Sequence, residues 1–597
     1  MLISTLSLAI EQSVNIKPPA DWVLQRQIDL HSDAPLNDLS DGTYYRLLDS
    51  QIKIDQAGER SQYSRFVETI VNKAGLEKSS QLNFYYDPSY QEFVLHHLFI
   101  YRNGKKIDKL KTAKISIFSQ ENDLKTQIYH GGLTVNILFD DLREGDTLDY
   151  SYSHLGSNPV YNNIFSYDRN LTWSVPVNHQ FIRVLWGKDQ PLYVNTRNIS
   201  PHIQKIKQAD HIEYQVAVHN AQHVQLASQT PQWYDPYGHI YFSETADWQR
   251  VTQWAEPLYK IQTLHPDIQA IANDIKQITS DKKQQISKAL AYAQNEIRYV
   301  GLEMGTNSHF PTPAHETVAL RYGDCKDKAL LLISILNALD ITAYPALVNT
   351  DDTKLLKETP PGLHYFDHVI VTLEQDGQRY WLDPTMIYQQ GLLDNIFQPD
   401  FAYALILNKN SSSLTSMSAT KVNSFSEITE KYALAGDPQA TANLSVESRF
   451  LGNKAQQKFH QIAQDGIKAL TEAYEIYYQS YYSKLNSIAE VTVAPDPYSG
   501  ILTLHERYQI NNIWTKADGG YEIDFYPQDI REAIYKPKQV VRNSPLAFNY
   551  PNNINNTIVL IFTEDGWDFD SKNVSEDNAF FSYHSKVNFD NNTFFRL

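Results

Sequence analysis

YGDCKDKALLL, residues 322–332, contains the single cysteine of a 597-residue chain. Aspartate is a common cap at the start of a helix, and apolar residues repeat at helical spacing from Leu330 to Leu339. The pattern predicts a helix that begins at Cys325, with Asp324 as its cap. The partial positive charge of a helix N-terminus favours the thiolate, which is the nucleophilic form of cysteine. The alternative is an inert thiol, because free cysteine is among the most buried residue types.

A second stretch, FDHVIVTLEQDGQRYWLDPT (residues 366–385), predicts a β-hairpin. Its Asp-Gly dipeptide at 376–377 suits a two-residue turn, and this turn would place Asp383 opposite Ile370. His368 lies two residues from Ile370 and projects from the same face. His368 and Asp383 are therefore expected to be diagonal neighbours, with side chains within reach of each other.

A cysteine nucleophile needs a histidine to accept and return a proton, and a third group to orient the imidazole. Cys325, His368 and Asp383 would supply these three roles. His368 and Asp383 could each also have a purely structural role, since a histidine at a strand start is often half-buried and an Asp-Pro pair often begins a turn. Their expected placement on one face, downstream of a helix-capped cysteine, favours catalysis.

Composition narrows the classes of partner and environment. The net charge is −17, with a pI near 5.6, and the basic residues are dispersed, so a nucleic-acid partner is not expected. One cysteine excludes an intramolecular disulfide. No stretch approaches the roughly 20 apolar residues that span a bilayer. The first residues, MLISTLSLAI, are similar to the apolar part of a signal peptide without its basic region, and an ordinary first strand is the alternative.

The chain, at 68.7 kDa, is too long for one hydrophobic core, so several domains are expected in a multidomain α+β fold. Short alternating runs of apolar residues predict an antiparallel, β-sandwich-like N-terminal domain. Helices followed by strands predict an α+β core. A Ser-rich linker then precedes a mostly-β C-terminal domain with one long helix. The expected divisions are 1–40 (an N-terminal segment, read as a trimmed signal), 41–247, 248–409 and 410–597, with the long helix at 453–482.

YGDCKDKALLL, FDHVIV and YWLDPT together closely resemble the core of the transglutaminase-like superfamily. The match is with bacterial multidomain proteins that carry a β-rich domain before this core, and it covers about residues 267–385. The resemblance implies a papain-like fold, with Cys325 as nucleophile, His368 as general base and acid, and Asp383 as the orienting carboxylate. It also implies an oxyanion-stabilising residue before the nucleophile. Tyr299 is a candidate for that role, and aromatic packing at a helix end is its alternative.

The predicted activity is acyl transfer on amide or peptide substrates through a thioester on the cysteine. Water as acceptor gives hydrolysis and an amine gives transamidation; the resemblance slightly favours hydrolysis. The alternative is a non-catalytic binding or assembly protein of the cell envelope, with a protein or glycan partner held by the β domains. An exported, periplasmic or envelope-associated protein is expected from the resemblance. No cofactor or metal is expected, because His309, His315 and His364 match no common zinc spacing.

Overall fold

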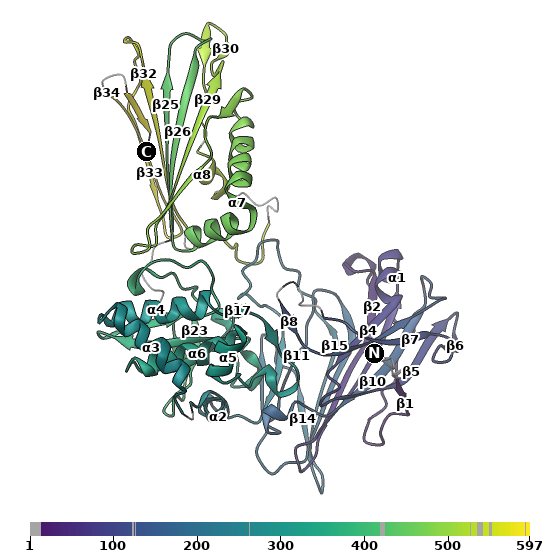
Figure 1. Ribbon diagram of the computed structural model, residues 1–597. Coiled ribbons are helices and arrows are strands. Elements are labelled where there is room, and N and C mark those ends of the chain that lie inside the picture. The colour runs from purple at the N-terminus through teal and green to yellow at the C-terminus, as the bar shows by residue number, and fades with distance from the viewer. Residues whose placement is uncertain are drawn as a thin grey trace, which may run out of the picture.

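The computed structural model describes residues 14–121, 125, 127–261, 263–417, 424–525, 527–533, 541–548, 552–590 and 593–596. Its elements follow one another in three regions, which Figure 1 shows as separate bodies. The N-terminal region runs from β1 (Asn15–Ile16) to β16 (His239–Ser243), the central region from α2 (Trp248–Ala255) to β24 (Thr415–Ser416), and the C-terminal region from β25 (Phe425–Leu434) to β35 (Thr593–Arg596). The multidomain α+β class, with β-rich outer regions, is confirmed. The domain boundaries stay predictions, and the signal-like residues 1–10 lie outside the described residues.

The N-terminal region is built on a nine-stranded sheet in the order β1-β5-β10-β3-β2-β12-β15-β14, with β6 paired to β5. Two three-stranded sheets, β4-β9-β7 and β11-β16-β13, accompany it. The remaining elements of this region are α1 (Lys73–Ser79), β2 (Thr43–Ile54), β3 (Arg60–Ile70), β4 (Gln81–Tyr86), β5 (Glu92–Arg102), β6 (Lys105–Asp108), β7 (Lys114–Ser119), β8 (Ile128–Tyr129), β9 (Leu133–Leu138), β10 (Thr147–Leu155), β11 (Ser166–Asn170), β12 (Val177–Trp186), β13 (Tyr193–Arg197), β14 (Ile203–Lys207) and β15 (Ile212–Ala221).

Both small sheets pack against the large sheet, which produces a sandwich. Phe84 of β4 and Val135 of β9 share a buried cluster with Leu98 of β5. In the other half, Phe242 of β16 packs in a cluster with Val184 of β12. Two pairs, β1 with β5 and β2 with β12, run parallel, although an antiparallel domain was predicted. Long connections between these strands allow the parallel pairing, because a parallel pair cannot be joined by a tight turn.

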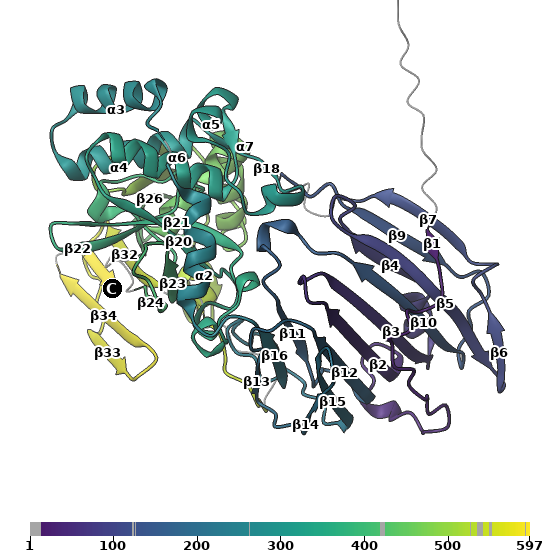
Figure 2. The same ribbon diagram turned by 90° about the horizontal axis from the view of Figure 1, so that it is seen from below.

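The central region places helices α3, α4 and α6 on one face of a five-stranded sheet, β22-β21-β20-β23-β24 (Figure 2). Strand β24 lies inside the stretch predicted as a Ser-rich linker. This segment forms a strand because its backbone pairs with β23. The elements of this region not yet bounded are α3 (Pro266–Ile278), α4 (Lys282–Asn295), β17 (Arg298–Tyr299), β18 (Gly301–Leu302), α5 (Ala314–Leu320), β19 (Tyr322–Gly323), α6 (Cys325–Ala338), β20 (Ala343–Val348), β21 (His368–Gln375), β22 (Gln378–Leu382) and β23 (Tyr403–Ile406).

The C-terminal region is a second nine-stranded sheet, β27-β29-β26-β25-β32-β35-β34-β33, with β28 paired to β29 and α7 packed beside it (Figure 1). Its other elements are β26 (Thr441–Leu451), α7 (Asn453–Gln479), β27 (Leu485–Ser487), β28 (Thr492–Pro495), β29 (Leu502–Asn511), β30 (Thr515–Ala517), β31 (Gly520–Glu522), α8 (Gln528–Ala533), β32 (Asn553–Phe562), β33 (Lys572–Asp577) and β34 (Ser582–Asp590).

The long helix predicted at 453–482 is interrupted. Gly466 adopts a non-helical conformation, with φ of 81° and ψ of 164°, so α7 consists of two helical segments. Glycine tolerates this backbone conformation because it has no Cβ. The apolar face of α7 packs against the sheet through Leu470 and Phe459, as a core-facing stripe should. Among the described residues, no helix is long and apolar enough to cross a membrane.

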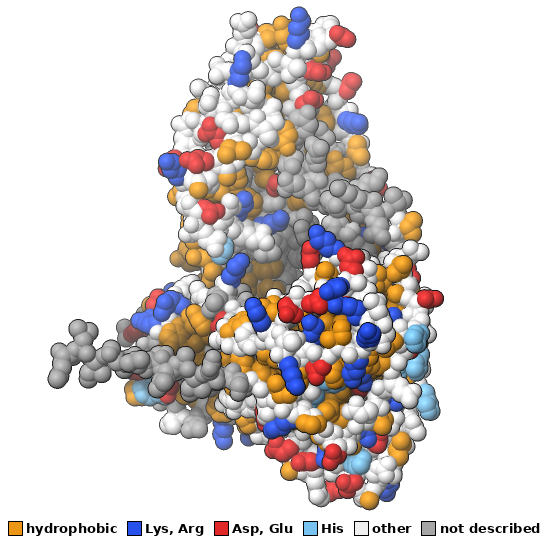
Figure 3. Space-filling view, turned by 90° about the vertical axis from the view of Figure 1, so that its right-hand side faces the viewer, with side chains coloured by type: hydrophobic (Ala, Val, Ile, Leu, Met, Phe, Trp, Pro, Cys, Tyr) orange, Lys and Arg blue, Asp and Glu red, His pale blue; other side chains and the backbone are white. Residues whose placement is uncertain are grey.

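Charged side chains of both signs are interspersed on the face of the molecule drawn in Figure 3. Basic and acidic side chains are mixed with one another there. This distribution corresponds to the dispersed charges of the sequence.

Candidate active site

The thiol of Cys325 stands at the start of α6, and the predicted cap is confirmed. The Asp324 carboxylate accepts hydrogen bonds from the backbone N–H groups of Lys326 (3.1 Å) and Asp327 (3.4 Å). The Asp327 carboxylate in turn accepts one from the Asp324 N–H, at 3.1 Å, which completes a capping box. Cys325 is partly exposed, so its thiol is available at a position where the helix dipole favours negative charge.

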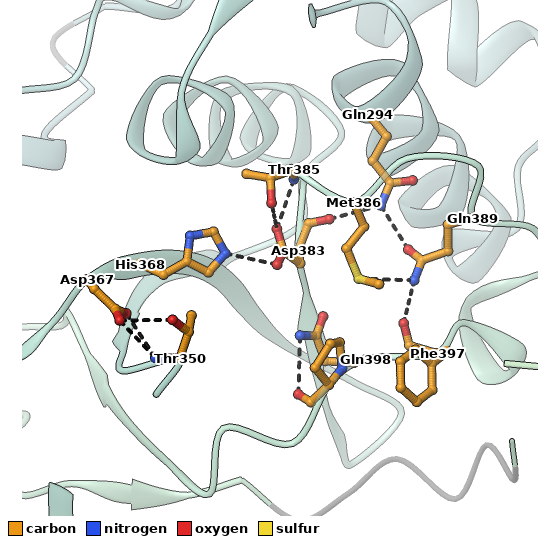
Figure 4. Close-up of polar contacts among 11 residues, drawn as sticks. Gln294, Thr350, Asp367, His368, Asp383, Thr385, Met386, Gln389, Phe397 and Gln398 are labelled. Carbon is orange, nitrogen blue, oxygen red and sulfur yellow. Dashed lines mark hydrogen bonds and ion pairs between the residues drawn. The ribbon is translucent and has the colours of Figure 1, made fainter. Parts of the chain in front are cut away.

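The hairpin of β21 and β22 has the predicted register. Gln375 pairs with Gln378, and the intervening Asp376 and Gly377 have φ values of 55° and 75°, as a two-residue turn requires. His368 is the first residue of β21, and Asp383 directly follows β22. The imidazole Nε2 lies 2.9 Å from Oδ2 of Asp383 (Figure 4).

Asp383 is fixed from several sides. Its second carboxylate oxygen, Oδ1, accepts hydrogen bonds from the backbone N–H (2.8 Å) and the hydroxyl (2.6 Å) of Thr385. The side-chain amide of Gln294, at the end of α4, donates to the Asp383 backbone carbonyl at 2.9 Å (Figure 4). Burial would raise the pKa of Asp383, but the charge and hydrogen bond of His368, together with the bonds from Thr385, lower it below its usual value. The carboxylate therefore stays ionised beside the imidazole.

His368 connects the carboxylate to the thiol. Burial would lower the pKa of the imidazole, but the charge and hydrogen bond of Asp383, with a further contribution from the neighbouring Cys325 thiol, raise it well above its usual value. Since Nε2 is engaged by Asp383, Nδ1 is the ring nitrogen left for the thiol. The ring of Phe401 packs edge-on against the imidazole, with centroids 6.1 Å apart. The structure thus brings together the three residues selected from the sequence.

Two tyrosines also lie near the thiol. Tyr299 is paired with Gly323, two residues before Cys325, through the parallel contact of β17 and β19. Burial and the negative charges of Cys325 and Asp324 raise the pKa of Tyr299, so its hydroxyl stays protonated and can donate a hydrogen bond. Tyr259, in the short 3-10 helix η4 (Glu256–Tyr259), has its pKa raised by burial and by the charge of Cys325. Nothing in the sequence around Tyr259 indicated this proximity.

A buried lysine links two of the elements that carry the site residues. Lys328 is fully buried in α6, and its ammonium donates to the backbone carbonyl of Ile297 at 2.7 Å and that of Gln294 at 3.4 Å. Burial lowers the pKa of Lys328 to about 8, although the charge of Asp383 opposes the shift. The lysine therefore ties α6 to the end of α4, from which Gln294 reaches Asp383.

His309, His315 and His364 have separate partners, and His315 lies in α5. His309 contacts Tyr161 and Trp254 with its ring, while His315 stacks on His265 at 4.3 Å. His364 bonds to Asp168 of β11. Within the described ranges, no three histidine, cysteine, aspartate or glutamate side chains converge as metal ligands would.

The N-terminal region contacts both segments that lead into the site. Strand β8 pairs in parallel with β18, directly after Tyr299, and the Gly301 N–H donates to the Gln127 carbonyl at 2.9 Å. On the other side, the hydroxyls of Ser243 and Thr245 both donate at 2.7 Å to the carbonyl of Pro361, in the loop that precedes His368. The large β region is therefore part of the frame of the site.

Comparison with known proteins places the fold. Residues 56–225 match the family model DUF3857, a domain of unknown function with a solved structure. The chain is similar to a crystal structure from Parabacteroides distasonis ATCC 8503, of a protein provisionally described as a protease, with a TM-score of 0.64 and 11% identity over 94% of this chain and 92% of that one. This similarity shows a shared fold across nearly the whole chain.

Two further structures overlap only in part. One is a provisionally described cysteine protease from Cytophaga hutchinsonii, with a TM-score of 0.18 and 13% identity over 37% of this chain and 74% of that one. The other is a zinc metallopeptidase from Deinococcus radiodurans, with a TM-score of 0.18 and 10% identity over 34% of this chain and 42% of that one. Similarities this low add nothing to the assignment of the fold. No curated protein sequence matches the chain.

Proposed function

We propose that the chain is a transglutaminase-like, cysteine-dependent acyl-transfer enzyme that acts on amide or peptide bonds. The proposal rests on one observation above all: the His368 imidazole is hydrogen-bonded to the buried Asp383 carboxylate at 2.9 Å, and its pKa is raised by Asp383 and by the neighbouring Cys325 thiol. This arrangement has the three roles of a catalytic triad, which are nucleophile, proton carrier and orienting group. The overall similarity to a protein provisionally described as a protease supports an amide-cleaving activity.

In the first step, the thiolate sulfur attacks the substrate carbonyl carbon and forms a C–S bond. The imidazolium of His368 gives its proton to the departing amine as the C–N bond breaks, which leaves a thioester on Cys325. The neutral imidazole then removes a proton from water, whose oxygen attacks the thioester carbon, and the C–S bond breaks. The products are a carboxylic acid and the regenerated pair of Cys325 thiolate and His368 imidazolium. A primary amine in place of water gives a new amide instead.

The negative charge that develops on the carbonyl oxygen needs hydrogen-bond donors. The Cys325 backbone N–H lies in the first turn of α6, where N–H groups have no acceptor inside the helix. The protonated hydroxyl of Tyr299 is our candidate for the second donor, because its pKa responds to the charge of Cys325. We favour hydrolysis over transamidation, with a protein or peptide as substrate at the cell envelope.

The test is a product assay on the full chain. Purified protein is incubated with a mixture of unrelated peptides, with and without a primary amine, and products are followed by mass spectrometry. We expect cleaved peptides that disappear in Cys325→Ala, His368→Ala and Asp383→Asn. Products that carry the added amine would instead establish transamidation. Turnover that is unchanged in Cys325→Ala, or no turnover of any peptide by a protein whose thiol is reactive, would contradict the proposal.

A further inference from the structure

A second candidate site lies between the N-terminal and central regions, away from the triad. A cavity of about 300 Å³ opens there, a volume at the lower end of the range for small-molecule sites. Cys325, His368 and Asp383 are not among its lining residues. The residues that decide its chemistry are Arg60, Tyr161, Phe165, Tyr167, Asp168 and His364.

Arg60 brings a positive charge into this cavity without a counter-ion. Its guanidinium lies over the rings of Phe165 and Tyr167, 5.6 and 5.7 Å from their centroids, and donates one hydrogen bond, at 2.7 Å, to the side-chain carbonyl of Gln62. Among the described residues, no aspartate or glutamate lies within ion-pair distance of it. Burial lowers the pKa of Arg60, and the side chains that oppose this shift are the phenols of Tyr167 and Tyr161.

Two other arginines of the same sheet are paired with carboxylates, whereas Arg46 of β2 bonds to hydroxyls and backbone carbonyls. Arg65 forms an ion pair with Asp149 at 2.9 Å, and Arg102 forms one with Asp146 at 2.7 Å. A partly buried charge without a partner costs free energy unless something neutralises it. Arg60 is half-buried in the wall of the cavity, and no carboxylate among the described residues is paired with it.

The acidic residue of the cavity is already engaged. The Asp168 carboxylate binds Nε2 of His364 at 2.7 Å, and the Ser166 hydroxyl lies 2.7 Å from the other ring nitrogen. Burial would raise the pKa of Asp168, but the hydrogen bond and charge of His364 lower it. Asp168 and His364 are therefore paired through one carboxylate oxygen, and Arg60 is a cationic group of the cavity that has no carboxylate partner among the described residues.

We infer that this cavity binds a carboxylate-bearing ligand, with the carboxylate on the Arg60 guanidinium and an apolar or aromatic group against Phe165 and Tyr167. Arginine binds a carboxylate through two parallel N–H donors, and the aromatic rings give an apolar wall to a cavity whose lining is otherwise of mixed polarity. A free small acid and the C-terminal residue of a peptide share this chemistry, and the volume admits one ring or one residue. The site is separate from the proposed catalytic centre and does not depend on its activity.

The probes are N-acetylphenylalanine and N-acetylphenylalaninamide, which differ only in the carboxylate. Titration calorimetry on the full chain should show the acid binding at least about tenfold more tightly than the amide, as expected for a charged hydrogen-bonded pair. Arg60→Gln should remove this preference, whereas Arg250→Gln, on the exposed surface of α2, should keep it. Peptides that end in phenylalanine, with free or amidated C-termini, distinguish the two sources of the carboxylate. Binding of the free-C-terminus peptide indicates that the cavity accepts the end of a peptide. If N-acetylphenylalanine binds but this peptide does not, the ligand is a small molecule.

The comparison of acid and amide on the unmodified protein is decisive even if Arg60→Gln does not fold. A cavity-filling change, Ser157→Trp, leaves Arg60 in place and should abolish binding of the acid. Equal affinity for acid and amide, no binding of the acid at millimolar concentration, or unchanged binding in a folded Arg60→Gln or Ser157→Trp protein would each overturn the inference. None of these measurements uses turnover, so they succeed or fail independently of the proposed enzyme activity.

Discussion

Replacing Asp383 by asparagine should slow alkylation of the Cys325 thiol near neutral pH. The carboxylate bonds to Nε2 of His368 at 2.9 Å and raises the pKa of the imidazole, so the imidazolium persists beside the thiol. An imidazolium neighbour favours the thiolate, which is the form that reacts with iodoacetamide. Asparagine has nearly the same shape but no charge, so Asp383→Asn removes the electrostatic support of the imidazolium with little change in packing.

The size of the effect follows from the strength of the bond. A hydrogen bond between charged groups contributes about 1.5–3 kcal/mol, and one pKa unit corresponds to about 1.4 kcal/mol. The pKa of His368 should therefore fall by about one to two units in Asp383→Asn, and alkylation should slow by about 10- to 100-fold. The difference should be greatest between about pH 6 and 8. In acid both proteins keep the imidazolium, and above a thiol pKa of about 8.5 the sulfur ionises without help.

The assay is favourable because the chain has one cysteine, so the mass of the alkylated protein reports a single thiol. Rates are measured from pH 5 to 9 for the unmodified protein, Asp383→Asn and Asp367→Asn. Asp367 is a matched control: it directly precedes His368, but its carboxylate accepts the N–H of Thr350 at 2.9 Å. We expect Asp367→Asn to react as the unmodified protein does. Equal profiles for all three proteins, or equal slowing in both variants, would refute the coupling.

Three further results are expected. Thr385→Val removes the hydroxyl bond to Asp383 but keeps the backbone N–H bond, so turnover in the peptide assay should fall by about 2- to 12-fold, less than in Asp383→Asn. Lys328→Met leaves two buried carbonyls without their donor and should lower the free energy of unfolding, measured by urea denaturation, by about 1–3 kcal/mol. Burial raises the pKa of Glu506, beside Glu430, to about 7, so the folded state keeps a proton that the unfolded state loses above about pH 4.5, and the free energy of unfolding falls as the pH rises to 7. Glu506→Gln should remove up to about 3 kcal/mol of that fall. The measurement is the difference in melting temperature between pH 5 and pH 8, which should be smaller in the variant.

The local parts of the site could be predicted from the sequence. The Asp324 cap and the register of the hairpin depend on residues a few positions apart, and both are as predicted. The Asp-Gly turn fixes which residues pair, so the diagonal contact of His368 and Asp383 follows from counting. The distance from this hairpin to the start of α6 depends on how the helix packs on the sheet, and the residues alone do not state it.

Contacts between residues far apart in the chain could not be predicted from the sequence. Lys328 was visible as one charge among several near the thiol, but its burial and its bonds to the end of α4 come from helix packing. Tyr259 lies far along the chain from Cys325 and carries no motif. The break in α7 at Gly466 shows the same limit, because a single glycine inside a helical pattern is compatible with either a continuous or an interrupted helix.

The N-terminal region has consequences for the triad because its contacts hold short, otherwise weakly supported segments. Strand β18 has two residues, and its backbone partner is β8. The loop before His368 is fixed by the Ser243 and Thr245 hydroxyls at Pro361 and by Asp168 at His364. Since His364 also lines the Arg60 cavity, a ligand bound there would contact the segment that carries His368, the proposed catalytic histidine. The N-terminal region is therefore placed to set the geometry of the site, and His364, which lines the cavity, is separated from His368 by three residues of chain.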